Sequence, residues 1–201
     1  MDEIAESSEL SKGTLYLYFK NKEELILSLL IVTLDTFRKI MEHNLKKQDT
    51  FQSRFSCIGE SYLEFYHKYP YQFKIMNHVP DHHPEIEHNA RELESELMAS
   101  STKLWSTVEG VIREGIDIGL IRKDVNPLEI GIALWASSNG MIQLMEHIKA
   151  DMKRCMDENG CLPEGNKYAP QFMTMDFEKM LRSLWEAVNN SILVKPNYNV
   201  S

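Results

Sequence analysis

The sequence predicts an all-α protein, and three observations lead to this prediction. Apolar residues recur at the three- and four-residue spacing of helices along most of the 201-residue chain. No segment alternates apolar and polar residues for long enough to indicate a strand. Glycine and proline fall mainly between the periodic segments, where helices begin and end. With 43% hydrophobic and 26% charged residues, the composition is that of an ordinary globular protein.

The first 46 residues predict three helices. Residues 1–7 form a short helix, and after a turn the second helix begins at Ser11, whose hydroxyl can accept a backbone N–H one turn in. The third helix begins after Asn21 and runs to about residue 46. Asn21 and Glu24 have the spacing of a capping box. The length of this third helix suits a connector between a small domain and a larger one.

The remainder predicts further helices, and the residues at their ends indicate where each begins and stops. Prolines 70, 84 and 127 stand at helix starts, where the missing N–H costs nothing. Gly115 and Gly119 mark a helix end near residue 118. Residues 151–175 contain several glycines and prolines and predict an unusually long loop. The expected helices are 51–68, 70–77, 84–99, 102–118, 127–149 and 176–193.

Two short helices separated by a tight turn, the second with an exposed polar face, predict a helix-turn-helix in the first 20 residues. In that motif the second helix lies in the major groove, and residues near its start reach base edges. Lys12 can donate to guanine, Thr14 can contact a base edge or a thymine methyl, and Gly13 lets the backbone approach closely. Lys22 adds charge at the start of the long helix. The candidate DNA contacts are Ser11, Lys12, Gly13, Thr14, Tyr16, Leu17, Tyr18 and Lys22.

The net charge of −8 taken alone argues against a nucleic-acid binder. However, residues 10–22 contain Lys12, Lys20 and Lys22 and no acidic residue. The acidic residues of this region flank the window on both sides. Because the charge is segregated locally, the negative total does not exclude DNA binding.

The stretch IAESSELSKGTLYLYFKNKEEL resembles the DNA-binding signature of the TetR family. The family pattern is IA, a helical spacer, V-S-K-G-T-L-Y, two variable positions, F, and K-x-K-E-E-L. The chain follows it at Ile4-Ala5, with Leu10 at the V position, and then through residues 11–16, Phe19 and residues 20–25. The resemblance implies a fold of about nine helices, a homodimer, and a variable helical ligand-binding domain. It further implies a repressor that a small-molecule effector releases from a palindromic double-stranded DNA operator.

The chain departs from the family pattern in two places. Glu9 stands in the turn where the family commonly has glycine, at a position that often needs a positive φ. The family also has a basic arm and a helix ahead of the helix-turn-helix, whereas this sequence begins at Met1, inside the bracing helix. We therefore expect the first helix to be missing, and expect this polypeptide to bind DNA less tightly than a version extended upstream.

These observations divide the chain into an incomplete DNA-binding domain at 1–25, an effector-binding and dimerisation domain at 26–195, and a tail at 196–201. Aromatic and methionine residues at helical spacing predict a pocket for a small apolar or aromatic molecule. Its candidate lining residues are Phe65, Tyr69, Phe73, Met76, Trp105 and Ile112. Two late helices with apolar faces, one also rich in small residues, fit a dimer interface. The candidate interface residues are Leu128, Ile132, Trp135, Ala136, Gly140, Met180, Leu181, Leu184 and Val188.

Other functional classes find little support in the sequence. We see no nucleophile motif or glycine-rich phosphate loop, and expect no enzyme and no cofactor. Residues 78–88 hold four histidines and three acidic residues, which are competent zinc or nickel ligands, but their spacing follows no compact pattern and we expect no metal. The three cysteines predict free thiols. With no apolar run of about 18 residues and no signal peptide, we expect a cytoplasmic protein with no membrane partner. The alternative is a helical ligand-binding protein that has lost DNA binding.

Overall fold

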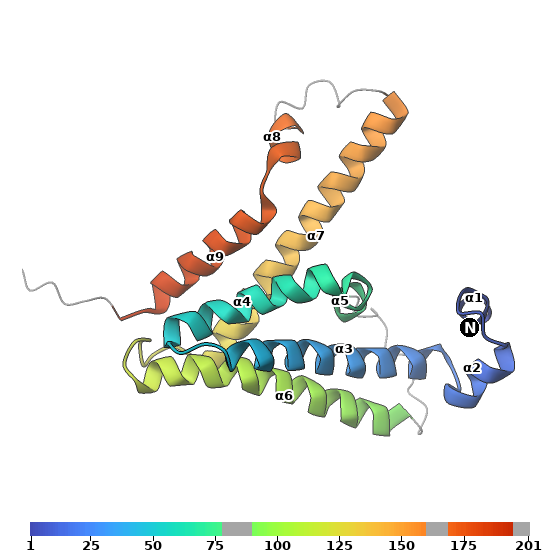
Figure 1. Cartoon of the computed structure of the whole chain (residues 1–201), viewed down its shortest axis with the longest axis horizontal. Coiled ribbons are helices and arrows are strands. Elements are labelled where there is room, and N and C mark those ends of the chain that lie inside the picture. The colour runs from blue at the N-terminus through green and yellow to red at the C-terminus, as the bar shows by residue number, and fades with distance from the viewer. Residues whose placement is uncertain (78–89, 160–168, 195–201) are drawn as a thin grey trace, which may run out of the picture. The chain divides into compact units, whose positions relative to one another are not determined.

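The computed structural model describes residues 1–77, 90–159 and 169–194, and these residues are helical apart from their connections (Figure 1). Within them the only bridge between extended residues joins Ile121 to Leu193. The all-α prediction is therefore confirmed. The chain divides into two compact units, residues 1–110 and 111–201. The helices are α1 (Asp2–Ser7), α2 (Lys12–Tyr18), α3 (Lys22–Leu45), α4 (Phe51–Lys68), α5 (Pro70–Asn77), α6 (Ala90–Asp117), α7 (Pro127–Asn159), α8 (Ala169–Thr174) and α9 (Phe177–Ile192).

Aromatic packing holds α3, α4 and α5 together in the first unit. The Phe37 ring on α3 lies 5.8 Å from the Tyr62 ring and 5.1 Å from the Phe65 ring, both on α4. Phe73 on α5 packs edge-on against Tyr62, with centroids 5.3 Å apart. Phe65 has no exposed surface. Aromatic pairs at these distances add about 0.5–1.5 kcal/mol each beyond the area that they bury. The long helix α3 is therefore fixed to its neighbours along its second half.

The turn between α1 and α2 is a Schellman motif with a glutamate where glycine is preferred. The Leu10 N–H donates to the Ala5 carbonyl and the Glu9 N–H to the Glu6 carbonyl, at 3.0 and 3.1 Å. This pattern requires a left-handed residue after the helix, and Glu9 occupies that position with a φ of +56°. The turn therefore keeps a positive φ although glutamate replaces the glycine that the family commonly has there. The end of α6 has the same two bonds, and there Gly119 takes the left-handed position with a φ of +75°.

The start of α3 differs in one bond from the predicted capping box. The Asn21 side chain accepts the Glu24 N–H at 2.8 Å, as expected. The Glu24 carboxylate, however, accepts the N–H of Lys20 at 2.8 Å and not that of Asn21. Glu24 is 9% exposed, so this bond satisfies a buried carboxylate at the joint between α2 and α3. The joint is thus fixed by two side-chain-to-backbone bonds that run in opposite directions.

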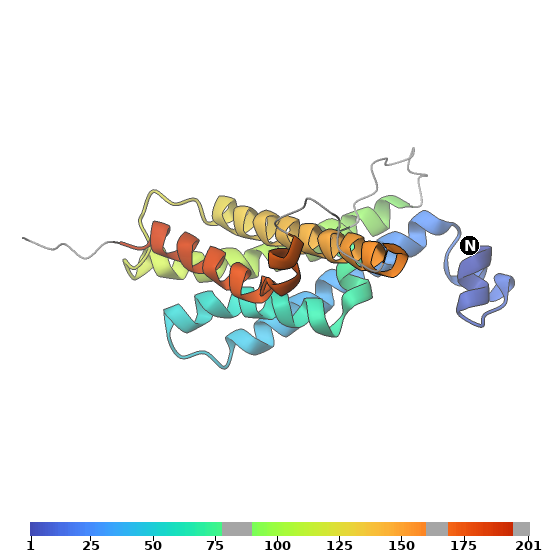
Figure 2. The same ribbon diagram turned by 90° about the horizontal axis from the view of Figure 1, so that it is seen from above.

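In the second unit, α7 and α9 run side by side (Figures 1 and 2). The Trp185 indole N–H on α9 donates to the Ser138 hydroxyl on α7 at 2.8 Å. Leu181 and Ile142 are 0% and 1% exposed. The backbone after α6 also bonds to the chain after α9, because the Val194 N–H donates to the Leu120 carbonyl at 2.9 Å.

Two predicted helix boundaries are wrong. Residues 90–117 form a single helix with no break near residue 100. The Thr102 hydroxyl donates to the Met98 carbonyl one turn earlier, so the run of hydroxyl residues there lies within the helix and does not end it. The predicted loop 151–175 contains the end of α7 and all of α8. Asp151 pairs with Arg154 at 2.9 Å on the extended part of α7, and such pairs support a helix. The expected helix start at residue 84 lies outside the described residues.

The left-handed backbone at Glu9 generates a stability prediction. The left-handed conformation strains a non-glycine residue by about 1–2 kcal/mol in the folded state. Glycine removes this strain, but it also stabilises the unfolded state because it makes the unfolded chain more flexible, so the net gain is smaller. We expect Glu9→Gly to raise the free energy of unfolding by about 0.5–1 kcal/mol, measured by urea denaturation. Glu9→Ala removes the same carboxylate but keeps the strain, and should not stabilise the protein. If both variants raise the free energy of unfolding equally, the charge of Glu9 and not backbone strain destabilises this turn.

Candidate functional site

The second helix of the helix-turn-helix, α2, presents most of its side chains to solvent. Tyr16, Leu17 and Tyr18 are 45%, 83% and 76% exposed, whereas Leu15 is 5% exposed and packs inward. Lys22, the first residue of α3, is also exposed. Exposed aromatic, apolar and cationic side chains thus surround one buried anchor, Leu15, as is typical of a short groove-reading helix. The predicted contact residues therefore lie on one continuous segment.

The start of α2 is organised by its cap. The Ser11 hydroxyl accepts the Thr14 N–H at 3.0 Å and lies 2.7 Å from the Thr14 hydroxyl. The Ser11 cap predicted from the sequence is confirmed. A Cβ added to Gly13 would meet no atom closer than Ser11 Oγ at 3.8 Å. Packing among the described residues therefore does not require glycine at this position, which is consistent with close approach of an external molecule to the backbone.

Two of the cations in this region are paired with carboxylates, and sequence reasoning missed both partners. Lys12 Nζ lies 2.7 Å from Asp2 Oδ2, and this hydrogen bond lowers the pKa of the Asp2 carboxyl and raises that of the Lys12 ammonium. Lys20 Nζ lies 3.8 Å from Glu24 Oε1. Asp2 is ten residues from Lys12, so only the fold of the turn reveals the pair. Lys20 precedes α3 and Glu24 lies in its first turn, so helical spacing does not predict this pair either.

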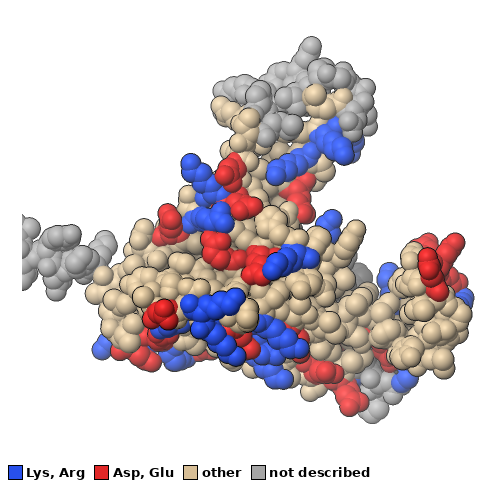
Figure 3. All heavy atoms as spheres, in the orientation of Figure 1, with Lys and Arg blue, Asp and Glu red and all other residues tan. Residues whose placement is uncertain are grey.

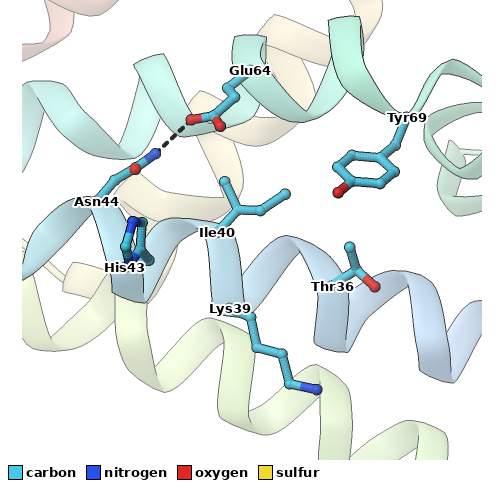
Figure 4. Close-up of a pocket in the computed structure, with 7 residues that line it drawn as sticks. All are labelled: Thr36, Lys39, Ile40, His43, Asn44, Glu64 and Tyr69. Carbon is cyan, nitrogen blue, oxygen red and sulfur yellow. Dashed lines mark hydrogen bonds between the residues drawn. The ribbon is translucent and has the colours of Figure 1, made fainter.

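A depression of about 410 Å³ lies between α3 and the end of α4 (Figure 4). Glu64 and Tyr69 face Thr36, Ile40 and Asn44 across it. The Asn44 amide donates to Glu64 at 2.7 Å, and hydrogen bonds from Lys68 first and Asn44 second lower the pKa of the Glu64 carboxyl. The full lining is Thr36, Lys39, Ile40, His43, Asn44, Glu64 and Tyr69. Nothing in the sequence distinguishes this polar face of α3 from an ordinary solvated one.

Only Tyr69 among the predicted pocket residues lines this depression. In the first unit Phe65, Phe73 and Met76 are 0%, 3% and 8% exposed, and Trp105 is half-buried. In the second unit Ile112 is 0% exposed. The structure thus places most of these residues in the cores of their units, and their role as an effector-binding set stays a prediction.

The predicted interface residues divide into an exposed and a buried group. On α7, Leu128 and Ile132 are 41% and 44% exposed, and Ala136 and Gly140 are exposed as well. Leu181 on α9 is 0% exposed and belongs to the core of its own unit, so it has no surface to offer a partner. The half-buried members are Trp135, Met180, Leu184 and Val188.

The described residues contain no cluster of three side chains able to hold a metal ion. The predicted candidates at 78–88 lie outside those residues, as does Cys161. Cys57 is a buried free thiol whose pKa is raised by burial, and Cys155 is a half-buried free thiol. No helix in the described part of the chain is long and apolar enough to cross a membrane.

Comparison with known proteins supports the resemblance of the N-terminal segment to the TetR family. Residues 1–29 match the family model for bacterial regulatory proteins of the tetR family. A curated relative, the fatty acid metabolism regulator protein of Bacillus subtilis (strain 168), is 23% identical over 126 residues. That alignment covers 63% of this chain and 62% of the relative, which is less than two thirds of the relative's length.

Two solved structures share the fold. The TetR family transcriptional regulator PfmR from Thermus thermophilus superimposes with a TM-score of 0.57 at 17% identity, over 92% of this chain and 85% of that one. The fatty acid degradation regulator FadR from Bacillus halodurans gives a TM-score of 0.63 at 11% identity, over 94% and 86%. Residues 1–29 therefore match the model of the tetR family of bacterial regulatory proteins, and the chain shares the fold of these two solved regulators.

Proposed function

We propose that the chain is a ligand-responsive, dimeric repressor that reads a near-palindromic DNA operator through α2. Residues 1–25 act as the DNA-binding domain and residues 26–195 as the effector-binding and dimerisation domain. The observation that carries the proposal is the exposed face of α2. Leu17 and Tyr18 are 83% and 76% exposed and Tyr16 is 45% exposed, although all three are large and partly apolar. Because exposed aromatic and apolar side chains next to a capped, glycine-containing helix start serve no packing purpose, contact with DNA explains their presence.

Tyr18 offers the sharpest test of DNA contact, because Tyr71 on α5 provides a matched control. The two tyrosines are 76% and 81% exposed, so neither substitution disturbs the core. We expect Tyr18→Ala to weaken binding to duplex DNA from the upstream region of the protein's own gene by about tenfold, or about 1.4 kcal/mol over two heads. Tyr71→Ala should leave the affinity unchanged. Fluorescence anisotropy measures both.

The same titration separates the proposal from its main alternative. A helical ligand-binding protein that has lost DNA binding would show no saturable binding to any duplex at low salt. In that case Tyr18→Ala and Tyr71→Ala would be indistinguishable from the unchanged protein. Saturable binding that only Tyr18→Ala weakens would reject the alternative.

Dimerisation is supported by an unpartnered apolar stripe on α7. Leu128, Ile132, Ala136, Gly140 and Leu144 follow one another at four-residue spacing, and all are exposed. A Cβ added to Gly140 would meet no atom of the described residues within 4 Å, so packing among those residues does not require glycine in the middle of this helix. A stripe of this kind is self-complementary across a two-fold axis, as a symmetric dimer requires. Two heads related by that axis would read half-sites about one helical turn apart.

A single charge on the stripe tests the dimer. Ile132 is 44% exposed in the single chain, so Ile132→Glu should leave each protomer folded. At a two-fold interface it would bury two unpaired carboxylates, at a cost of about 3–5 kcal/mol for an uncompensated buried charge. We expect a monomer by light scattering at micromolar concentration, with loss of operator binding. Ser106→Glu adds the same charge to an exposed position on α6 and should leave a dimer. If Ile132→Glu remains dimeric, the stripe is not the interface.

The effector is proposed to be a small apolar or aromatic molecule. Two of the similar proteins are named for fatty acid metabolism, so a fatty acid is the first compound to test. We expect hexadecanoic acid to lower the anisotropy of the protein–DNA complex, because ligand and DNA must change each other's affinity by the same factor. Butanoic acid has the same carboxylate and a short chain, and should have little effect. If hexadecanoic acid at saturating concentration leaves the anisotropy of the protein–DNA complex unchanged, a long-chain fatty acid is not the effector.

We further propose that the protein acts in the cytoplasm and has no enzymatic activity, because residues 1–29 match a family model of regulatory proteins.

A further inference from the structure

The ion pair between Asp2 and Lys12 links the two helices of the DNA-reading head. Asp2 is the first residue of α1 and Lys12 the first residue of α2. Their side chains are 70% and 58% exposed, with the ammonium and carboxylate 2.7 Å apart. Lys12 is the only charged residue in α2, whose sequence is KGTLYLY. The single cation of the recognition helix is therefore held by a carboxylate from the bracing helix.

The ion pair affects the relative strength of the contacts that Lys12 can make with DNA phosphates and with base edges. A lysine ammonium is a compact charge on a flexible stem, and it can settle on any nearby phosphate oxygen. Phosphate contacts add affinity without sequence information, whereas contacts to base edges specify sequence. A carboxylate beside the ammonium repels phosphates and ties the flexible stem to the helix start. Since an ammonium has three N–H donors, two remain for guanine O6 and N7 while one is held by Asp2.

We propose that Asp2 is a specificity-determining residue of the DNA-reading head, which acts through Lys12 by disfavouring phosphate contacts relative to base contacts. The inference rests on the proposed function of α2 as the DNA-contacting helix. Specificity is a difference between two affinities, and a repulsive element against the wrong complex raises it as effectively as a new contact in the right one. Asp2 is a positioning residue and itself need not touch a base.

The neighbouring surface supplies a matched control. Acidic side chains gather on the head where α1 lies (Figure 3). Glu3 is the next residue of α1, also exposed and also in the first turn, and it has no ion pair with a described residue. Asp2→Asn and Glu3→Gln therefore remove one negative charge each from adjacent positions. Only the first removes the partner of Lys12.

The experiment compares two duplexes of equal length, one selected for binding from random-sequence DNA and one unrelated. Affinities are measured by fluorescence anisotropy over a series of NaCl concentrations. We expect Asp2→Asn to tighten binding to the unrelated duplex about threefold per head, and so about tenfold for a dimer. Its salt dependence should steepen by about one released counterion per head. Binding to the selected duplex should change less, so that the ratio of the two affinities falls. Glu3→Gln should leave this ratio within about twofold.

Lys12→Gln shows whether Asp2 acts through Lys12. In that background Asp2→Asn should have no more effect than Glu3→Gln, because the interaction that couples the two sites is gone. An unchanged or increased affinity ratio in Asp2→Asn would overturn the inference, and so would an equal fall in Glu3→Gln or a full effect without Lys12. Those results all require measurable DNA binding. Absence of binding to either duplex, in the unchanged protein and in Asp2→Asn, would instead contradict the proposed function itself.

Discussion

The packing of Phe37 against α4 and α5 is the constraint on which the first unit depends. Its ring lies within 6 Å of Tyr62 and Phe65, and Phe73 closes the cluster from α5. This cluster fixes the second half of α3, while the first half leads to the DNA-binding head through the caps at Asn21 and Glu24. A helix held rigidly at one end carries the orientation of whatever is joined to its other end. The aromatic core and the segment that precedes α3 are therefore connected by one continuous helix.

The head itself combines a strained turn with balanced charges. Glu9 adopts a left-handed conformation because the Schellman bonds at the end of α1 require it. Lys12 and Lys20 are each paired with a carboxylate, although both stand in a window without acidic residues. The local segregation of charge seen along the sequence is thus cancelled in part by the fold. The head therefore has less unpaired positive charge than residues 10–22 alone indicate, in a chain whose net charge is −8.

The two units place the predicted ligand and dimer residues in different physical settings. The side chains that the sequence predicts to line an effector pocket are mostly core residues, and Phe65 and Ile112 are 0% exposed. Apolar periodicity identifies a buried face, but it cannot tell a closed core from the lining of a cavity. Four of the five residues predicted on α7 are exposed and Trp135 is half-buried, so there the same periodic signal marks a face that the described residues leave open. On α9, which packs against α7, the predicted interface residue Leu181 is buried.

The sequence by itself determined the helical class, the cap at Ser11 and the long helix after Asn21. These features depend on residues within a few positions of one another, so local chemistry decides them. Helix ends without a strong stop signal were misjudged, as in α6 and α7, because hydroxyl residues and ion pairs can sit inside a helix. Only the tertiary structure decided which cations are paired, which apolar faces are covered and that Glu24 bonds to Lys20. Those outcomes depend on contacts between separate helices, or on a choice among competing nearby donors, which spacing along the chain does not encode.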